Sequence, residues 1–223
     1  MMLTLYHLPV SSNSRRVWIA LLEKAIPFEQ VLLKLDGDQF KPEFLDLNPF
    51  HHVPVLVDNG FKVIESLAIL DYLEAKYPTP SLTPSDVNGI AIARMVQMVT
   101  LNELWSPMIW LTGEVLGVVT RKPDQLKKAR QQVFTVLKFF ENLLNDSPYF
   151  GSDRLTLADI TAGTMVPQLP SLGVPLDNYP KLTAWSERLM ARNSWQKTQP
   201  SPEALAAAMP QAKAIIQAHL LGK

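Results

Sequence analysis

The segment 53–73 limits the possible folds of this chain more than any other, because several structural signals follow one another within it. An apolar strand at 55–57 runs into the pair Asn59-Gly60, whose residues favour the positive φ angles of a two-residue hairpin turn. After a return strand, Ser66 has the chemistry of an N-cap at the start of an apolar helical run. The segment therefore predicts a β-hairpin that leads directly into a helix.

Glu65 and Ser66 also form a candidate binding site. A helix N-terminus with a hydroxyl cap binds anions, and an acid immediately before it can hold a cation. Together the two groups suit the carboxylate and the amine of one α-amino acid. We expect a cis peptide bond before Pro54, with the backbone of Val53 facing the ligand. The alternative is that Glu65 and Ser66 only cap the helix, which the order of the whole segment disfavours.

Residues 1–77 alternate strand and helix patterns and predict the order β-α-β-α-β-β-α. Before the hairpin, the expected elements are parallel strands at 3–7 and 28–33 and helices at 14–24 and 41–47. From Pro78 onward, three prolines fall within a few residues of each other, and such a stretch cannot propagate a helix. We therefore predict a linker at 78–87.

Residues 88–223 predict an all-helical domain, since no convincing strand pattern follows the linker. The expected helices lie at 87–111, 123–145, 157–166, 180–191 and 202–219. The first of them is apolar almost all round, so we expect it to be buried on several sides, against the first domain and against another subunit. Thr156 and Asp159 have the spacing of a capping box, which makes Asp159 a buried cap rather than an acid catalyst.

The chain contains no cysteine, which excludes disulfides, thiolate metal sites and thiol redox chemistry of its own. A thiol takes part only if a ligand brings it. Lys and Arg number 21, as do Asp and Glu, so the basic footprint of a nucleic-acid partner is absent. The four histidines lack the spacing of a metal site, and we predict none. Without a signal-peptide pattern or a long apolar run, we expect a cytoplasmic protein with no membrane partner.

The turn between the first strand and the first helix carries four polar residues, Ser11, Ser12, Asn13 and Ser14. A hydroxyl here can donate a hydrogen bond to a ligand sulfur, which favours the thiolate and lowers the pKa of the thiol, and the helix dipole adds to this. One charge-assisted hydrogen bond of about 1.5–3 kcal/mol covers much of the roughly 2.7 kcal/mol needed to lower a pKa by about 2. We expect this turn to bind a thiol.

The Val-Pro step, the hairpin and the pair Glu65-Ser66 resemble the glutathione-binding segment of the cytosolic glutathione transferases. The polar turn resembles that of their serine-type members, the phi, theta and zeta classes. The capping box at 156–159 also matches the family, so the resemblance spans nearly the whole chain. It implies a thioredoxin-like N-terminal domain at 1–77, an all-helical C-terminal domain, and a homodimer.

The resemblance implies that Ser11 is the catalytic residue that contacts the glutathione sulfur. Ser12 and Asn13 are alternates if the loop is shifted. Tyr6 is a rival because other classes use a tyrosine at the end of this strand. Its register is one residue off for that role, and its position is also typical of a core strand residue.

The resemblance also assigns the rest of the glutathione molecule. It implies seven glutathione-binding residues: Gln39, Lys41, His52, Val53, Pro54, Glu65 and Ser66. The Glu-Ser pair holds the γ-glutamyl end, and the Val-Pro loop pairs with the cysteinyl backbone. Gln39, Lys41 and His52 contact the glycyl end. His52 departs from the Gln or Lys that is common at its position, and a solvent-exposed loop histidine is the alternative there.

The electrophile pocket is expected between the Ser11 turn and the helix at 87–111. Helical spacing, which is also typical of a core stripe, suggests Met95, Met98, Asn102 and Trp105. We predict that the protein conjugates glutathione to a hydrophobic electrophile. The alternatives are isomerisation of a maleylacetoacetate-type diacid or peroxide reduction at the same site, and a non-catalytic ligand-binding or interaction module. The zeta isomerases have a cysteine where this chain has Asn13.

Overall fold

The computed structural model describes residues 3–34, 36–120 and 122–220, which form two compact units. The first unit combines the N-terminal part of the chain, up to Leu82, with Arg192–Ala208. The second combines Thr83–Ala191 with the chain from Met209 onward. The sequence did not indicate that a late segment joins the first unit.

A four-stranded sheet forms the centre of the first unit, with the strand order β2-β1-β3-β4. The strands are β1 (Leu3–His7), β2 (Phe28–Leu32), β3 (Val55–Asp58) and β4 (Phe61–Ile64). Strands β1 and β2 are parallel, whereas β3 is antiparallel to both of its neighbours. Asn59 and Gly60 have φ angles of 50° and 87°, which confirms the predicted hairpin turn.

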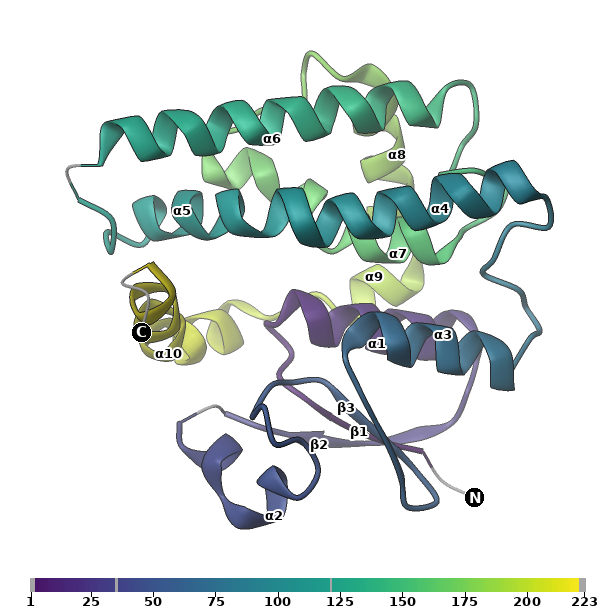
Figure 1. The fold of residues 1–223 in the computed structure, drawn as a ribbon, viewed down its shortest axis with the longest axis vertical. Helices are drawn as coiled ribbons and strands as arrows, with labels where there is room; N and C mark the ends of the chain where they lie inside the picture. The colour runs from purple at the N-terminus through teal and green to yellow at the C-terminus, as the bar shows by residue number, and fades with distance from the viewer. Residues whose placement is uncertain (1–2, 35, 121, 221–223) are drawn as a thin grey trace. The chain divides into compact units, whose positions relative to one another are not determined.

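Three helices accompany the sheet in the N-terminal part of the chain, and they confirm the predicted β-α-β-α-β-β-α order. They are α1 (Ser12–Glu23), α2 (Pro42–Leu45), which follows a 3₁₀ turn at Asp38–Phe40, and α3 (Ser66–Lys76). Figure 1 shows α1 and α3 on one face of the sheet and α2 on the other. Leu5, Leu21, Leu56, Ile69 and Leu73 are fully buried. Burying each side chain of this kind contributes about 1.5–3 kcal/mol.

The late segment returns to the first unit through an ion pair with α1. Nε and Nη2 of Arg192 donate to the two carboxylate oxygens of Glu23 at 2.9 and 2.6 Å, and the hydroxyl of Ser194 donates to the same carboxylate. A short helix, α9 (Asn193–Lys197), begins immediately after Arg192. The sequence does not reveal this helix, because five residues are too few to show a helical period.

The described residues of the second unit form helices joined by loops, with an isolated β-bridge between Tyr149 and Ser152. Its helices are α4 (Val87–Val99), α5 (Trp105–Val115), α6 (Pro123–Leu144), α7 (Leu157–Gly163) and α8 (Pro180–Met190), and α10 (Pro202–Leu220) enters it from the first unit. The predicted single helix at 87–111 is wrong in its middle, because a π-helical stretch, Thr100–Leu104, separates α4 from α5. The prediction of a helix to residue 166 is also wrong, because α7 stops at Gly163 and a 3₁₀ helix, Val166–Leu172, follows.

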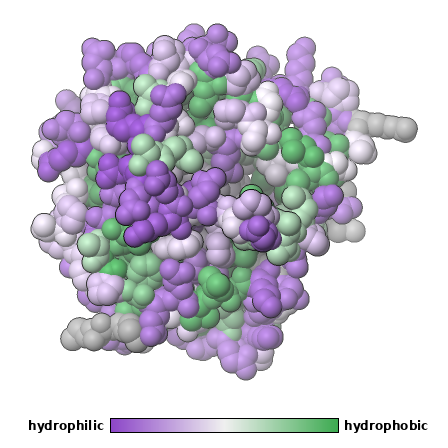
Figure 2. Space-filling model, turned by 180° about the vertical axis from the view of Figure 1, so that it is seen from behind, coloured by the Kyte–Doolittle hydropathy of each residue, from purple (hydrophilic) through white to green (hydrophobic). Residues whose placement is uncertain are grey.

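Helices α4 and α5 carry several exposed apolar side chains. Ile90, Met95, Met98 and Trp105 are 38, 42, 45 and 37 % exposed, so this chain alone does not cover the helices on all sides. Figure 2 shows hydrophobic residues interspersed with hydrophilic ones on one face of the molecule. Among the described residues, no helix combines the length and apolarity needed to cross a bilayer.

The predicted capping box at the start of α7 is confirmed. The hydroxyl of Thr156 accepts from the backbone N–H of Asp159, and the Asp159 carboxylate accepts from the Thr156 N–H at 2.7 Å. The same carboxylate also accepts from the backbone N–H of Phe150 and from Nε1 of Trp185, at 3.0 and 2.8 Å. Burial raises the pKa of Asp159 to about 6, against the opposing effect of these hydrogen bonds. Asp159 is therefore a buried structural cap.

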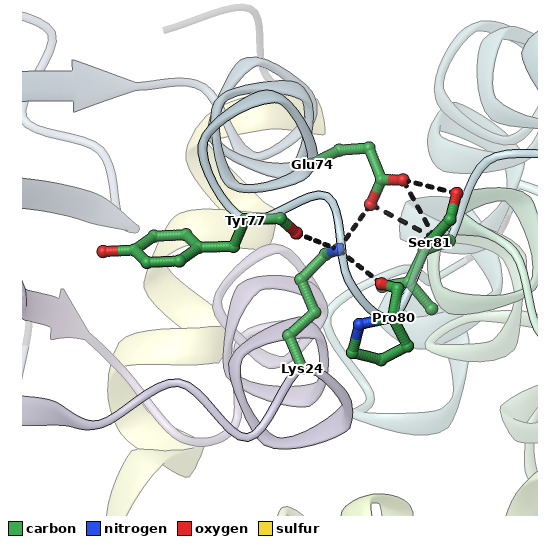
Figure 3. Close-up of polar contacts among 6 residues, drawn as sticks. Lys24, Glu74, Tyr77, Pro80 and Ser81 are labelled. Atoms are coloured by element: carbon green, nitrogen blue, oxygen red, sulfur yellow. Dashed lines mark hydrogen bonds and ion pairs between the residues drawn. The ribbon is translucent and has the colours of Figure 1, made fainter.

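A buried ammonium group fixes the end of the first unit (Figure 3). The side chain of Lys24 is 0 % exposed, and its Nζ lies 2.6 Å from a Glu74 carboxylate oxygen. Nζ also donates to the backbone carbonyls of Tyr77 and Pro80, both at 2.7 Å. Glu74 accepts in turn from the backbone N–H of Leu82 at 3.0 Å. The proline-rich stretch up to Leu82 is thus held against α1 and α3.

We predict that Lys24→Met lowers the free energy of unfolding by about 3–5 kcal/mol, because it leaves the Glu74 carboxylate unpaired in a mostly buried place. Urea denaturation measures the change. Lys62→Met is the matched control, since its ion pair with Asp46 is exposed and should contribute less than about 1 kcal/mol. Equal effects of the two substitutions would contradict the stabilising role of the buried Lys24–Glu74 pair.

Candidate active site

The turn between β1 and α1 is held by two serine hydroxyls. Ser11 is the N-cap of α1, and its Oγ accepts from the backbone N–H of Ser14 at 3.4 Å. The fully buried Oγ of Ser14 accepts from the backbone N–H of Leu8 at 3.2 Å. The Ser11 N–H closes the turn on the carbonyl of Leu8 at 3.0 Å. Since the Ser11 oxygen already accepts, its O–H remains a donor for a ligand.

The first turn of α1 is electropositive. It contains no acidic residue, and a helix N-terminus carries a partial positive charge. Arg15 and Arg16, the fourth and fifth residues of α1, are 6 % and 0 % exposed. Burial lowers the pKa of both guanidinium groups, that of Arg16 to about 10, so Arg16 remains charged at neutral pH. An anion near Ser11 is therefore favoured.

The Val53-Pro54 peptide bond is cis, as predicted. Val53 is buried in a small apolar cluster with Leu33, Phe44 and Val55. The loop before it is fixed by Asn48, whose Nδ2 donates to the backbone carbonyl of His52 at 2.9 Å. The loop that precedes β3 is thus held by a hydrogen bond to the His52 carbonyl and by the packing of Val53.

The prediction that Ser66 caps α3 is wrong. Glu65 occupies the N-cap position without a side-chain capping bond, and Ser66 is the first residue of the helix. The Ser66 hydroxyl instead accepts from Nη1 of Arg16 at 3.3 Å. Glu65 has a φ of 67°, a strained conformation for a residue with a side chain that costs of the order of 1–3 kcal/mol and commonly marks a functional position. Its side chain is exposed.

Three predicted residues lie in the loops that precede the hairpin. Lys41 is exposed at the start of α2. Gln39 lies in the 3₁₀ turn, and its Oε1 accepts from the backbone N–H of Gly37 at 3.1 Å. His52 is exposed, with its ring 5.5 Å from that of His51. The structure gives none of them a described contact with the Ser11 turn, so a common role at one end of a ligand remains a prediction.

The alternates for the sulfur contact have different surroundings. Tyr6 lies in the middle of the sheet, paired with Val31 and Val55, and its ring packs against Phe44 with centroids 6.4 Å apart. Ser12 is the first residue of α1 and is half-buried. Asn13 is half-buried, and its Oδ1 accepts from Nη1 of Arg16 at 2.6 Å.

The four predicted electrophile-pocket residues all belong to the second unit. Met95 and Met98 lie on α4, Asn102 lies in the π-helical stretch, and Trp105 begins α5; all four are exposed. The four residues therefore do not belong to the core of this chain. That they form an electrophile pocket together with the Ser11 turn remains a prediction.

Arg16 contacts both Asn13 and Ser66, which we did not predict from the sequence. The two donor–acceptor pairs bring the polar turn and the start of α3 together across 50 positions of sequence. The signal was the basic pair close to the start of a helix, where a positive charge is unfavourable for the helix dipole. A basic residue at such a position does not stabilise its own helix, which indicates that it interacts with another part of the structure.

Two family models match the chain. They are described as the glutathione S-transferase N-terminal domain, over residues 5–81, and the C-terminal domain, over residues 96–193. Among curated proteins, the chain is 33 % identical over 199 residues to glutathione S-transferase hmp2 of Hypomyces subiculosus, covering 83 % of this chain and 92 % of that protein. It is 33 % identical over 195 residues to maleylacetoacetate isomerase of Rattus norvegicus, covering 85 % and 88 %.

Two solved structures resemble the fold over nearly all of their length. A glutathione transferase homologue from Sulfitobacter, with bound glutathione, has a TM-score of 0.74 at 27 % identity, and the match covers 88 % of this chain and 96 % of that one. A glutathione S-transferase from the Antarctic clam Laternula elliptica has a TM-score of 0.81 at 25 % identity, covering 97 % and 100 %.

We predict that Ser14→Ala destabilises the protein more than Ser11→Ala does. Removing the buried Ser14 hydroxyl leaves the Leu8 N–H without its acceptor, at a cost of about 1–3 kcal/mol. The longer bond of the half-buried Ser11 should contribute about 1 kcal/mol or less. Chemical denaturation of both variants measures the difference, and a larger loss for Ser11→Ala would contradict the described turn.

Proposed function

The chain belongs to the glutathione S-transferase family in both of its domains, and we propose that it conjugates glutathione to a hydrophobic electrophile with Ser11 as the catalytic residue. The observation that carries this role is the geometry of Ser11. Its oxygen accepts from the helix backbone, which leaves its O–H free to donate to the sulfur.

The proposed effect of Ser11 is to keep the glutathione sulfur ionised. A free thiol has a pKa of about 8.5, so roughly 3 % is thiolate at pH 7. A hydrogen bond from the hydroxyl to the thiolate stabilises the charged form by about 1.5–3 kcal/mol. The start of α1, which has no acidic residue in its first turn, adds about 0.3–1 kcal/mol. Together these effects make the thiolate the major form without a general base.

Glutathione itself is proposed to lie along the first unit. Its γ-glutamyl end would contact Glu65 and Ser66, where an exposed carboxylate and a hydroxyl stand next to each other. Its cysteinyl backbone would pair with Val53 in the loop closed by cis Pro54. Its glycyl carboxylate would face the cationic or polar side chains of the preceding loops, namely His52, Lys41 and Gln39.

The second substrate is proposed to be apolar. The candidate residues Met95, Met98 and Trp105 expose large hydrophobic surfaces on α4 and α5, and burying such a surface against a hydrophobic substrate is favourable. Asn102 adds one polar side chain at the π-helical stretch. We also propose a cytoplasmic location, in keeping with the family of the relatives.

A second candidate reaction is isomerisation of a maleylacetoacetate-type diacid. The similarity to a maleylacetoacetate isomerase favours it, as do the three serines of the polar turn. Asn13 stands where the zeta isomerases have cysteine, which disfavours it. The two reactions are distinguished by assaying the purified protein with maleylacetoacetate and with a panel of aromatic electrophiles, each in the presence of glutathione.

We predict that Ser11→Ala lowers the turnover number about 10- to 100-fold, which corresponds to one lost charge-assisted hydrogen bond, while the affinity for glutathione changes little. Steady-state conjugation assays and isothermal titration calorimetry provide the two measurements. Ser12→Ala is the control in the same turn and should retain turnover. Unchanged turnover in Ser11→Ala, or a loss confined to Ser12→Ala, would assign the sulfur contact to another residue.

We propose that the protein is a homodimer that covers the exposed apolar residues at the start of α4. Val87 and Ile90 are 80 % and 38 % exposed there, and monomeric proteins seldom leave such side chains uncovered when they form a patch. Analytical ultracentrifugation at micromolar concentration should give twice the chain mass of 25.0 kDa. An Ile90→Asp substitution should shift the equilibrium to the monomer, whereas a wild-type protein of single-chain mass would refute the proposal.

A further inference from the structure

The guanidinium group of Arg16 joins the two parts of the proposed site. Arg16 is the fifth residue of α1 and is 0 % exposed. Its Nη1 donates to Oδ1 of Asn13 at 2.6 Å and to Oγ of Ser66 at 3.3 Å. Asn13 belongs to the turn proposed to bind sulfur, and Ser66 begins the helix proposed to bind the γ-glutamyl end. One side chain therefore contacts both ends of the cysteinyl-glutamyl portion of the site.

Arginine carries only hydrogen-bond donors, and this determines what its partners can do. The Asn13 amide must turn its carbonyl oxygen toward Arg16, so its NH₂ group points to the other side. The Ser66 oxygen accepts from Arg16, so its O–H is left to donate elsewhere. A buried guanidinium thereby converts two groups that could either donate or accept into donors.

The proposed ligand requires a hydrogen-bond donor both at Asn13 and at Ser66. The γ-glutamyl end of glutathione carries a carboxylate, and its reactive sulfur is a thiolate, and both groups only accept hydrogen bonds. We propose that Arg16 is a positioning residue that commits the Asn13 amide to donate to the glutathione sulfur and the Ser66 hydroxyl to donate to the γ-glutamyl carboxylate. This inference rests on the proposed function.

The charge of Arg16 supports the same arrangement. Burial lowers its pKa to about 10, which leaves it protonated at neutral pH, so the direction of both hydrogen bonds is constant in that range. A buried cation also favours an anion nearby. The neighbours Val17, Ile19 and Ala20 on the same helix are apolar and equally buried. Burial of this part of α1 therefore does not require a charged side chain.

A purely structural role for Arg16 makes a different prediction. Removing the guanidinium takes the donor away from Asn13 and Ser66 and lowers the free energy of unfolding, but a structural role implies no further effect on a folded variant. Arg16→Met would then fold and bind glutathione as the wild type does. A positioning role requires a loss of affinity and a rise in the pKa of the bound thiol, even when the variant is folded.

The experiment begins with the wild-type protein. Calorimetry measures the affinity for glutathione, and the ultraviolet absorbance of the thiolate as a function of pH measures the pKa of the bound thiol. Failure of the wild type to bind glutathione would refute the proposed function itself. Binding with a lowered thiol pKa would establish the baseline against which the variants are compared.

Arg16→Met should then weaken glutathione binding about tenfold, as expected for one hydrogen bond to a charged group, and should raise the pKa of the bound thiol. In a Ser66→Ala background, Arg16→Met should cause little further loss of affinity, because its effect on the carboxylate acts through Ser66. Arg16→Lys, which keeps a donor and the charge, should restore part of both properties. Arg154→Met is the control, since Arg154 is exposed.

Two results would overturn the inference. One is a folded Arg16→Met variant with wild-type affinity and thiol pKa. The other is a fully additive loss of affinity in the Arg16→Met, Ser66→Ala double variant. If Arg16→Met does not fold, the single variants Asn13→Ala and Ser66→Ala decide the question. Asn13→Ala should raise the thiol pKa and Ser66→Ala should weaken binding, and the absence of both effects would refute the proposal.

Discussion

The contact between the buried Arg16 guanidinium and the Ser66 hydroxyl is the interaction on which the candidate site depends. The start of α1 and the start of α3 are about 50 positions apart in sequence, and the two helices pack against each other. Arg16 spans the distance by donating to Asn13 on its own helix and to Ser66 on the other. Because the group is fully buried, its contacts are little screened by water. The positions of the two donor groups are thus set by one side chain.

The absence of cysteine determines what chemistry the turn before α1 can perform. A turn at the start of a helix, lined with serines, has nothing to oxidise and no nucleophile of unusual strength. It offers a hydroxyl donor at Ser11, the helix dipole and nearby buried cations. These features stabilise an anion that arrives from outside, and a thiolate is the anion that membership of the glutathione S-transferase family implies.

Much of the fold was predictable because its signals are local. The Asn59-Gly60 hairpin and the capping box at Thr156 depend on residues a few positions apart, and both are confirmed. The helical pattern of the second half likewise predicted α6 and α8 within one residue at each end. The missed side-chain contacts are long-range. Ser66 has the chemistry of a cap, yet a guanidinium 50 positions away takes its oxygen, and Arg192 returns to Glu23 across 169 positions. Periodicity carries no information about either pairing.

The central claim is that Ser11 holds the sulfur while Ser66 holds the γ-glutamyl end of the same molecule. A crystal structure of the protein with glutathione tests this claim most directly. We predict the sulfur within hydrogen-bonding distance of the Ser11 hydroxyl and the γ-glutamyl carboxylate within hydrogen-bonding distance of the Ser66 hydroxyl. A sulfur bound to Tyr6 instead, or a glutamyl end away from Ser66, would contradict the account.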